Sequence, residues 1–360
     1  MFDTRLPFGA CRGCSIFHRL SQAVKRMMIR RGYLDIVVYL DDFLVIADTY
    51  VKCCEAQQVL IQLLGSLGFF VSWHKVYGPS TKLTFLGIEI DTMNCCLRLD
   101  DEKLKKINNK LCEFQYKVRA TKRQLQSLAG LLNWACQAVR GGRFFLRRVL
   151  DMVNLLKSGN HKAKLGYAFK SDITWWRRYM IKCNGVVYYH AFDTNIVVHT
   201  DACNVGGGAF SQGDWFYRNW SVDIPQASNL HINYKEVLAV TQAVEQWCHR
   251  WTNANVVIMT DNTVTKAVIN KGTCKSPLVM KHLRRLFWEM ELYNFKLHAV
   301  HIPGCINFLP DAISRLHEKG QFEHLCGFLQ NWYHGYFPLN LLSHMSRGAF
   351  QMLQRQGVRM

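Results

Sequence analysis

The pattern of apolar and polar positions first stands out at two short β-branched runs, residues 36–40 and 43–47, which flank Asp41 and Asp42. Apolar runs of this length predict buried strands, so we expect a tight hairpin with both carboxylates at its tip. Adjacent carboxylates at a tip are suited to divalent cations, although Asp-Asp is also an ordinary polar turn. Residues 85–90 and 95–99 predict a second hairpin.

Helical spacing follows each hairpin. Tyr50 to Leu67 has apolar residues at helical intervals, and Gly68 is placed to end that helix. Thr121-x-x-Gln124 is a capping-box motif, which predicts the start of another helix. Further helices are predicted at 21–31 and 171–180, and after Asp100, where one face carries Leu104, Ile107, Leu111, Phe114 and Val118.

The second half of the chain mixes strands and helices. Residues 196–200, 206–210 and 215–217 predict an antiparallel three-stranded meander. A helix at 233–247, a buried strand at 256–260, two helical stretches and a last strand at 296–302 follow. This order predicts an α/β layer built on one sheet, so the whole chain is expected to be an α+β and α/β multidomain protein.

Length and charge narrow the class of protein. At 360 residues the chain has room for two or three domains. Its formal charge of +19 favours a phosphate polymer as partner, although an anionic membrane surface would also attract it. No apolar run approaches the roughly 20 residues that span a bilayer, and no signal-peptide core is visible. We therefore predict an intracellular nucleic-acid-binding protein, in the cytoplasm or the nucleus, without a membrane partner.

The fourteen cysteines are spread through apolar segments, which is typical of reduced intracellular thiols. Cys11-x-x-Cys14 is the only pair at metal-ligand spacing, and no second pair completes a zinc site. The sequence therefore favours neither a disulfide scaffold nor structural zinc.

Basic residues concentrate after residue 100 in two groups. They are Lys103, Lys105, Lys106 and Lys110 in the first group, and Arg140, Arg143, Arg147 and Arg148 in the second. Such residues form either a solvated basic face or a surface for a phosphate backbone. Because no acidic residue is interleaved between the first and last members of either group, we favour the second interpretation.

Four motifs in order resemble those of reverse transcriptases. They are Leu6-Pro7-Phe8-Gly9, Tyr39-Leu40-Asp41-Asp42, the segment from Gly68 to Lys75, and Thr84-Phe85-Leu86-Gly87. The resemblance implies a polymerase palm that acts on template RNA and primer DNA, with Asp41 and Asp42 as metal-binding catalytic residues and Lys75 as the group that protonates pyrophosphate. It also implies nucleic-acid contacts, in the palm and in a helical thumb, for Phe8, Gly9, Tyr39, Leu86, Gly87, Arg140, Arg143 and Arg147.

The polymerase motifs depart from the family pattern at the N-terminus. The family places a first catalytic Asp on a strand before the Leu-Pro-Phe-Gly segment, and Asp3 is too close to Leu6 to play that part. The fingers are absent from the sequence, and residues 10–14 differ from the usual continuation. We therefore expect this polypeptide alone to polymerise poorly or not at all.

A second acidic set lies in the C-terminal half: Asp201, Glu236, Asp261 and Asp311. Each has a structural alternative, because Asp201 could form a turn, Glu236 could partner an Asn233 cap, Asp261 could cap a helix, and Asp311 could sit in a helix first turn. Together, with their neighbours and in this order, they resemble ribonuclease H.

The ribonuclease H resemblance implies that the four carboxylates are joint ligands of two Mg²⁺ ions, with Mn²⁺ as an alternative, and that the chain hydrolyses RNA in an RNA–DNA hybrid. Two dications held close together need about four anionic ligands, which fits the number found. Cys305 stands where the family often has a mobile His, so slower turnover is expected.

The combined resemblance is to a retrotransposon polyprotein fragment of the DIRS or gypsy type. The expected domains are a partial palm at 1–99, a thumb and connection at 100–185, a ribonuclease H-like domain at 186–318 and a tail at 319–360, with a short helix at 346–353, that could start a further polyprotein domain. Two alternatives are a non-catalytic nucleic-acid-binding remnant and a structural subunit that partners a full-length polymerase.

Overall fold

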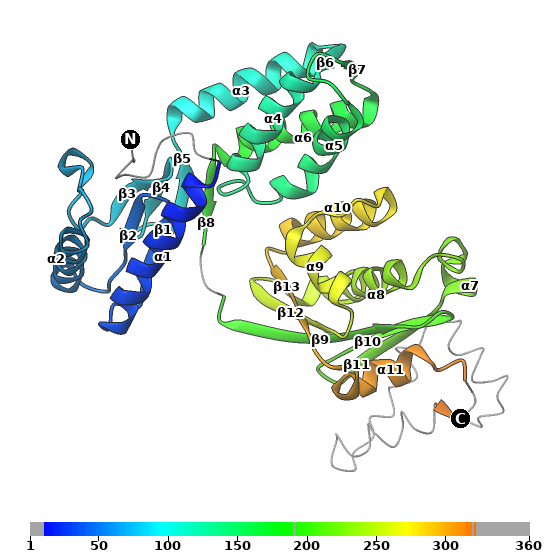
Figure 1. Cartoon of the computed structure of the whole chain (residues 1–360). Coiled ribbons are helices and arrows are strands. Elements are labelled where there is room, and N and C mark those ends of the chain that lie inside the picture. Colours follow the sequence, from blue (N-terminus) through cyan, green and yellow to red (C-terminus); the bar gives the residue numbers. More distant parts are fainter. Residues whose placement is uncertain (1–10, 190–191, 319, 322–360) are drawn as a thin grey trace. The chain divides into compact units, whose positions relative to one another are not determined.

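The computed structural model describes residues 11–189, 192–318 and 320–321, and the chain folds into two compact units, 1–100 and 101–360. Phe8, Gly9 and the helix expected at 346–353 lie outside the described residues. The architecture mixes sheets and helices, as the sequence predicts (Figure 1). None of the described helices combines the length and the apolar character that crossing a membrane requires.

The first unit combines two helices with two small antiparallel sheets. Its elements are α1 (Gly13–Arg30), β1 (Ile36–Tyr39), β2 (Asp42–Val45), α2 (Tyr50–Ser66), η1 (Trp73–Lys75), β3 (Lys82–Phe85), β4 (Ile88–Asp91) and β5 (Cys96–Leu99). β1 alternates buried and exposed residues, so Ile36 and Val38 pack inward against Met28 of α1 and Leu60 and Leu63 of α2. Both predicted hairpins are confirmed.

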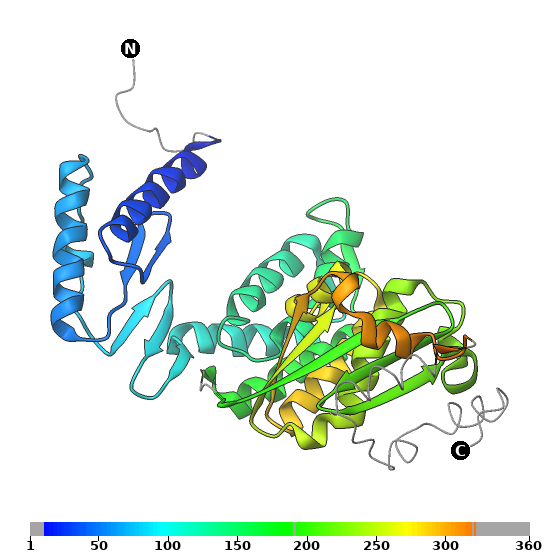
Figure 2. The same cartoon turned by 90° about the horizontal axis from the view of Figure 1, so that it is seen from below.

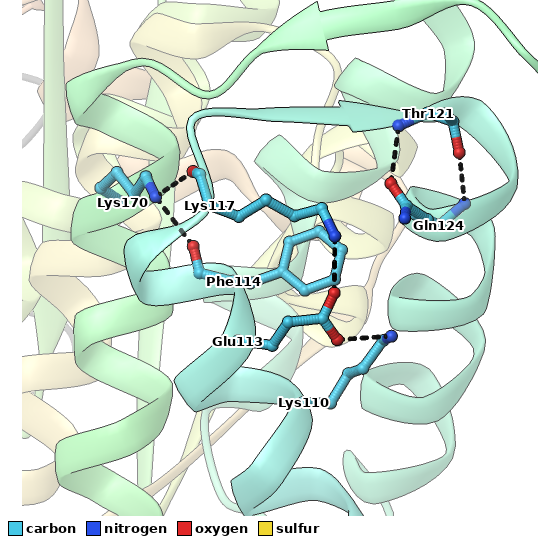
Figure 3. Close-up of polar contacts among 7 residues, drawn as sticks. All are labelled: Lys110, Glu113, Phe114, Lys117, Thr121, Gln124 and Lys170. Atoms are coloured by element: carbon cyan, nitrogen blue, oxygen red, sulfur yellow. Dashed lines mark hydrogen bonds and ion pairs between the residues drawn. The ribbon is translucent and has the colours of Figure 1, made fainter.

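The helical part of the second unit is a layer of four helices with short strands between them. Its elements are α3 (Asp101–Tyr116), β6 (Arg119–Thr121), α4 (Lys122–Ala135), α5 (Gly142–Leu155), β7 (Lys162–Lys164), α6 (Tyr167–Cys183) and β8 (Val186–Tyr188). The predicted capping box is present, because Thr121 and Gln124 exchange side-chain and backbone hydrogen bonds (Figure 3).

Two sequence predictions for this helical part are corrected by the structure. Val118 was expected on the apolar face of the first helix, but α3 ends at Tyr116 and Val118 is 66% exposed. The helix expected at 171–180 begins four residues earlier, at Tyr167, directly after Gly166 as N-cap. Phe169, in the added first turn, is 3% exposed, so packing extends the helix beyond the predicted range.

The rest of the second unit is a five-stranded sheet with helices on both faces (Figures 1 and 2). Its elements are β9 (Thr194–Ala202), β10 (Gly206–Ser211), β11 (Asp214–Asn219), α7 (Trp220–Asp223), η2 (Pro225–Ala227), α8 (Ile232–Trp247), η3 (Cys248–Arg250), β12 (Ala254–Thr260), α9 (Thr263–Lys271), α10 (Pro277–Leu292), β13 (Lys296–His301), η4 (Gly304–Ile306) and α11 (Phe308–Ser314).

The strand order is β11-β10-β9-β12-β13, in which β9, β10 and β11 form the predicted antiparallel meander and β12 and β13 run parallel to β9. Figure 1 shows α8, α9 and α10 on one face of the sheet and α11 on the other. The core between the sheet and the three helices includes Val198, Val256, Val240 and Leu283.

A buried ionic contact joins the helical part to α10 within the second unit. Asp172 of α6 is 1% exposed and accepts from Arg148 of α5 at 2.5 Å and from Arg284 of α10 at 3.1 Å. Phe145 stacks on Trp175 at 3.9 Å beside these groups. Burial raises the pKa of Asp172 to about 6, although both arginines act in the opposite direction.

Candidate metal centre

The parallel pairing of β9 and β12 brings two carboxylates to one edge of the sheet. Met259 lies opposite His199 in this ladder, and continuing the register by two residues places Asp261 beside Asp201. On its other side, Asp201 is paired with Gly208 of β10. Asp201 is therefore part of a central strand, and the turn proposed for it from sequence is wrong.

Helix α8 supplies Glu236 from its second turn. The capping role considered for Glu236 is also wrong, because the helix begins at Ile232 and His231 is the N-cap, whose Nδ1 accepts from the backbone N–H of Asn233 at 3.1 Å. Glu236 is 4% exposed and accepts a hydrogen bond from the backbone of Ala202. Its Oε2 atom is buried and has no hydrogen-bond partner within the structure.

The helix-capping role considered for Asp261 is wrong as well. The residue that caps α9 is Asn262, whose Oδ1 accepts from the backbone N–H of Thr265 at 2.9 Å. The Asp261 carboxylate is thus left for another role, and a Cβ on Gly304 would lie 3.2 Å from its Oδ2.

Asp201, Glu236 and Asp261 converge into one cluster. Each offers an oxygen, and these oxygens lie within 4.8 Å of one another. Among the described residues, this is the group of three or more acidic, His or Cys side chains that could hold a metal ion. Burying a carboxylate oxygen without a partner costs free energy, and a bound cation would remove that cost. The three carboxylates are oxygen ligands of the kind that divalent cations such as Mg²⁺ prefer, so the cluster fits such an ion.

Asp311 lies at the rim of this cluster. It sits in the first turn of α11, as its structural alternative predicts, and its Oδ1 accepts from Arg315 Nε at 2.9 Å. Its side chain is 47% exposed, and its charge acts on Asp201. The structure therefore brings three of the four predicted carboxylates into one group and leaves the fourth paired with Arg315 beside them.

Three consecutive glycines in β10 allow α11 to lie against the sheet. A Cβ on Gly208 would lie 2.3 Å from Ile313 Cγ2, and a Cβ on Gly206 would lie 2.6 Å from the carbonyl oxygen of Ser314. Neither position leaves space for a side chain, so the glycines set how closely the helix that carries Asp311 approaches Asp201.

Burial and mutual repulsion change the protonation of the cluster. Burial raises the pKa of Asp201 to about 7, with smaller contributions from the charges of Asp261 and Asp311. Burial also raises the pKa of Glu236 to about 9, and the charges of Asp201 and Asp261 add to the effect. Without a cation, protons neutralise these carboxyl groups; a bound dication would displace them.

Sequence reasoning gave no role to Asn307, which connects the parts of this centre. Asn307 is fully buried, and its Nδ2 donates to the carbonyl oxygen of Thr200, the residue before Asp201. It is also the residue before α11, so it ties the strand of Asp201 to the helix of Asp311. A buried Asn just before a short helix is a weak signal in sequence, because most such residues are caps.

The first unit presents the other predicted site residues on its two hairpins. Asp41 lies in the turn between β1 and β2, Asp42 is the first residue of β2, and both are exposed. Tyr39 pairs with Asp42 and is 54% exposed. In the described part of this unit, Asp41 and Asp42 do not join a group of three potential metal ligands.

The remaining predicted palm residues occupy turns. Leu86 and Gly87 form the two-residue turn between β3 and β4, and both have positive φ, 51° and 80°. This geometry matches the twist of a tight hairpin and explains the glycine. Lys75 ends η1 and is exposed.

The three predicted thumb arginines differ in their surroundings. Arg140 binds within the second unit, to Glu291 at 3.0 Å and to the carbonyl oxygen of Phe295 at 2.6 Å. Arg147 is ion-paired with Asp151. Arg143 is exposed. The nucleic-acid contacts expected for Arg140 and Arg147 would therefore compete with partners inside the chain.

Comparison with known proteins first gives the class of the N-terminal part. Residues 2–90 match the family described as "Reverse transcriptase (RNA-dependent DNA polymerase)". This part of the chain therefore carries a reverse transcriptase domain, in agreement with the hairpin of Asp41 and Asp42.

The chain is also homologous to viral enzymatic polyproteins. It is 25% identical over 331 residues to the putative enzymatic polyprotein of Cassava vein mosaic virus, and 24% identical over 333 residues to the enzymatic polyprotein of Cauliflower mosaic virus (strain NY8153). These alignments cover 86% and 87% of this chain and 47% and 45% of those proteins. The chain thus spans about half the length of the curated relatives that it matches.

Among solved structures, the chain is similar to the foamy viral protease-reverse transcriptase in complex with an RNA/DNA hybrid, with a TM-score of 0.43 and 16% identity over 82% of this chain and 39% of that one. The assignment of this chain to a DIRS-type or gypsy-type retrotransposon lineage stays a prediction.

Proposed function

We propose that this chain is a reverse transcriptase and ribonuclease H fragment, in which the cluster of Asp201, Glu236 and Asp261, with Asp311 at its rim, hydrolyses the RNA strand of an RNA–DNA hybrid. The observation that carries the proposal is the convergence of three carboxylates from β9, α8 and the end of β12, with oxygens within 4.8 Å and the Glu236 Oε2 atom unpartnered. The homology to enzymatic polyproteins supports the same assignment.

The residues of the cluster would hold Mg²⁺, with Mn²⁺ as the alternative ion. When bound, divalent ions in such sites activate water and stabilise the leaving oxygen of a phosphodiester. The chain itself contributes fixed ligand positions, because Asp201 is held in a central strand and Glu236 by its hydrogen bond from Ala202. Arg315 holds the Asp311 carboxylate at the rim, where a cation would compete with Arg315 for Asp311 and a phosphate would compete with Asp311 for Arg315.

The domain roles that accompany this proposal are a palm at 1–99, a thumb and connection at 100–185, and a ribonuclease H-like domain at 186–318. RNA-directed DNA polymerisation belongs to the same proposal, with Asp41 and Asp42 as metal ligands, Lys75 as a proton donor to pyrophosphate, and template RNA and primer DNA as substrates. The family match over 2–90 supports it. Among the described residues, Asp41 and Asp42 have no third potential metal ligand beside them, so weak polymerisation is expected.

The nuclease proposal is tested by incubating the purified chain with an end-labelled RNA–DNA hybrid and Mg²⁺. We expect cleavage of the RNA strand, and a loss of at least a hundredfold in Asp261→Asn, since that change removes one charged ligand. Asp193→Asn is the matched control, because Asp193 is an exposed carboxylate outside the cluster.

Cleavage that persists unchanged in Asp261→Asn would refute the assignment. An intact hybrid with the unmodified chain would favour a non-catalytic nucleic-acid-binding protein. Primer extension that appears only after a longer polymerase chain is added would favour a structural subunit.

A further inference from the structure

The short ribbon formed by β6 and β7 places two positive charges opposite each other, an arrangement that is unfavourable in a β-ladder. Arg119 and Lys164 lie directly opposite each other in this antiparallel pair, with Ala120 and Ala163 as the next pair. Ala120 is 1% exposed, so alternation places the charged residues on the outer face. Like charges directly opposite each other destabilise a ladder.

A second unfavourable placement of positive charge occurs at the N-terminus of α4, next to β6. Lys122 and Arg123 are the first two residues of this helix, which has no acidic residue in its first turn. A helix N-terminus carries partial positive charge and favours acidic residues, so two cations there are unfavourable. The backbone N–H groups of Lys122 and Arg123 donate to the carbonyl oxygens of His161 and Gly159, so these two donors of the helix end are already satisfied within the chain. The side chain of Lys122 is half-buried and that of Arg123 is exposed.

Other lysines close to the ribbon differ, because their charges are paired within the chain. Lys110 and Lys117 both pair with Glu113, and Lys170 donates to the carbonyl oxygens of Phe114 and Lys117 (Figure 3). The segments 118–126 and 157–166 contain no Asp or Glu. Five cations therefore remain together without an acidic partner in the described part of the chain, and we call them the ribbon surface: Arg119, Lys122, Arg123, Lys162 and Lys164.

Two exposed aromatic side chains flank the ribbon surface. Tyr116 ends α3 and is 76% exposed, and Tyr167 begins α6 and is 91% exposed. The backbone N–H of Leu165 donates to the carbonyl oxygen of Val118 at 2.9 Å, which brings the two segments that carry the tyrosines side by side. Cations beside exposed aromatic rings are typical of surfaces that bind single-stranded nucleic acid.

We propose that the ribbon surface binds a single strand of nucleic acid, with phosphates against its five cations and bases stacked on Tyr116 and Tyr167. This site is separate from the carboxylate cluster, since the helical layer lies between the ribbon and the sheet in Figure 1. It does not depend on the hydrolytic reaction, and it would hold a strand that has left, or not yet entered, a duplex.

The first test compares two variants of the full chain that have the same net charge. The ribbon variant is Arg119→Gln/Lys162→Gln/Lys164→Gln, and the control is Lys266→Gln/Lys271→Gln/Lys281→Gln, three exposed lysines on α9 and α10. Binding of fluorescent single-stranded DNA, single-stranded RNA and hybrid duplex is measured by anisotropy over a range of salt.

We expect the slope of log affinity against log salt for single strands to fall by about 2 in the ribbon variant, because each lost phosphate contact contributes about 0.7. The control variant should keep its slope, and Lys162→Arg/Lys164→Arg should keep both slope and affinity. Equal losses in the ribbon and control variants would overturn the proposal. So would a change in slope confined to the duplex.

A second measurement uses the unmodified protein, so it does not depend on a variant that folds. Acetylation of lysines is followed by mass spectrometry with and without the oligonucleotide. Lys122, Lys162 and Lys164 should be protected while Lys266 and Lys271 are not. Equal modification with and without the strand would overturn the proposal.

The stacking part of the proposal is tested at the tyrosine that is almost fully exposed. Tyr167→Ala should weaken single-strand binding about tenfold, because a stacked base contributes about 1–3 kcal/mol. Tyr167→Phe should retain binding, since the ring is kept. Unchanged affinity in Tyr167→Ala would remove Tyr167 from the site.

Discussion

Glu236→Gln is expected to stabilise the metal-free protein and to remove most of its response to Mg²⁺. Glu236 is 4% exposed, accepts from the backbone of Ala202, and leaves its Oε2 atom without a partner. Gln has the same shape and keeps the acceptor, and its amide can donate toward the Asp201 and Asp261 carboxylates. The substitution therefore removes a buried acid without opening a cavity.

The magnitude follows from the pKa of Glu236, which burial raises from 4.5 to about 9. A carboxyl group whose folded pKa is raised contributes its full stability below the unfolded pKa, and that stability is lost as pH rises toward the folded value. At a pH three units above 4.5, the cost is on the order of 4 kcal/mol, at about 1.4 kcal/mol per unit. The repulsion is shared with Asp201, whose pKa is raised to about 7, so the two costs are not added.

The assay is thermal unfolding in EDTA and in Mg²⁺, between about pH 5 and pH 8. In EDTA, the advantage of Glu236→Gln over the unmodified chain should grow as pH rises. Mg²⁺ at a hundred times its Kd stabilises the unmodified chain by about 2.7 kcal/mol, or roughly 5 to 10 °C for a unit of this size. The variant should show much less of this shift, and Asp193→Asn should behave as the unmodified chain does.

Either of two results would refute this reasoning. A Tm in EDTA that falls in Glu236→Gln would mean that the carboxylate stabilises the fold. A full Mg²⁺ shift in the variant would mean that the ion binds elsewhere.

Three further predictions address the fold and the two sites. Asp172→Ala removes the buried carboxylate that Arg148 and Arg284 share and should cost about 3–5 kcal/mol, measured by urea unfolding; a change below about 1 kcal/mol would show that the contact is unimportant. Gly208→Ala forces a methyl group against Ile313 and should reduce both Tm and hybrid cleavage, whereas unchanged cleavage would separate α11 from the site. Asn307→Ala should lower kcat for hybrid cleavage about tenfold with little effect on KM, since it loosens Asp311 and Asp201 without touching substrate; a change in KM alone would contradict this.

Much of the fold follows from local signals in the sequence. Alternation in β1, the glycine after α2 and the capping box at Thr121 identify elements that the structure confirms, because each signal acts over a few residues. Element ends were less predictable. Val118 looked like part of an apolar helical face, but α3 ends before it and the chain turns into β6.

The site could be predicted only in part, since its geometry depends on pairing between distant segments. The sequence identified four acidic residues, but the register of β9 with β12 brings Asp261 beside Asp201, and no local pattern encodes that register. The role of Asn307 and the pairing of Asp311 with Arg315 likewise depend on how α11 lies against β10.

The structural alternatives for Glu236 and Asp261 fail for a shared physical reason. At α8 and α9, a neighbour that is not an acid does the capping: His231 in place of the Asn233–Glu236 pair, and Asn262 in place of Asp261. An acid used as a cap is stabilised by backbone N–H groups and gains little from a cation, whereas an acid left beside another capping residue is available as a ligand. The ribbon surface shows the converse, since cations occupy a helix start that would favour acids. Departures from local electrostatic preference therefore accompany both proposed sites, and each proposed ligand has the opposite charge: a cation at the cluster, a phosphate strand at the ribbon.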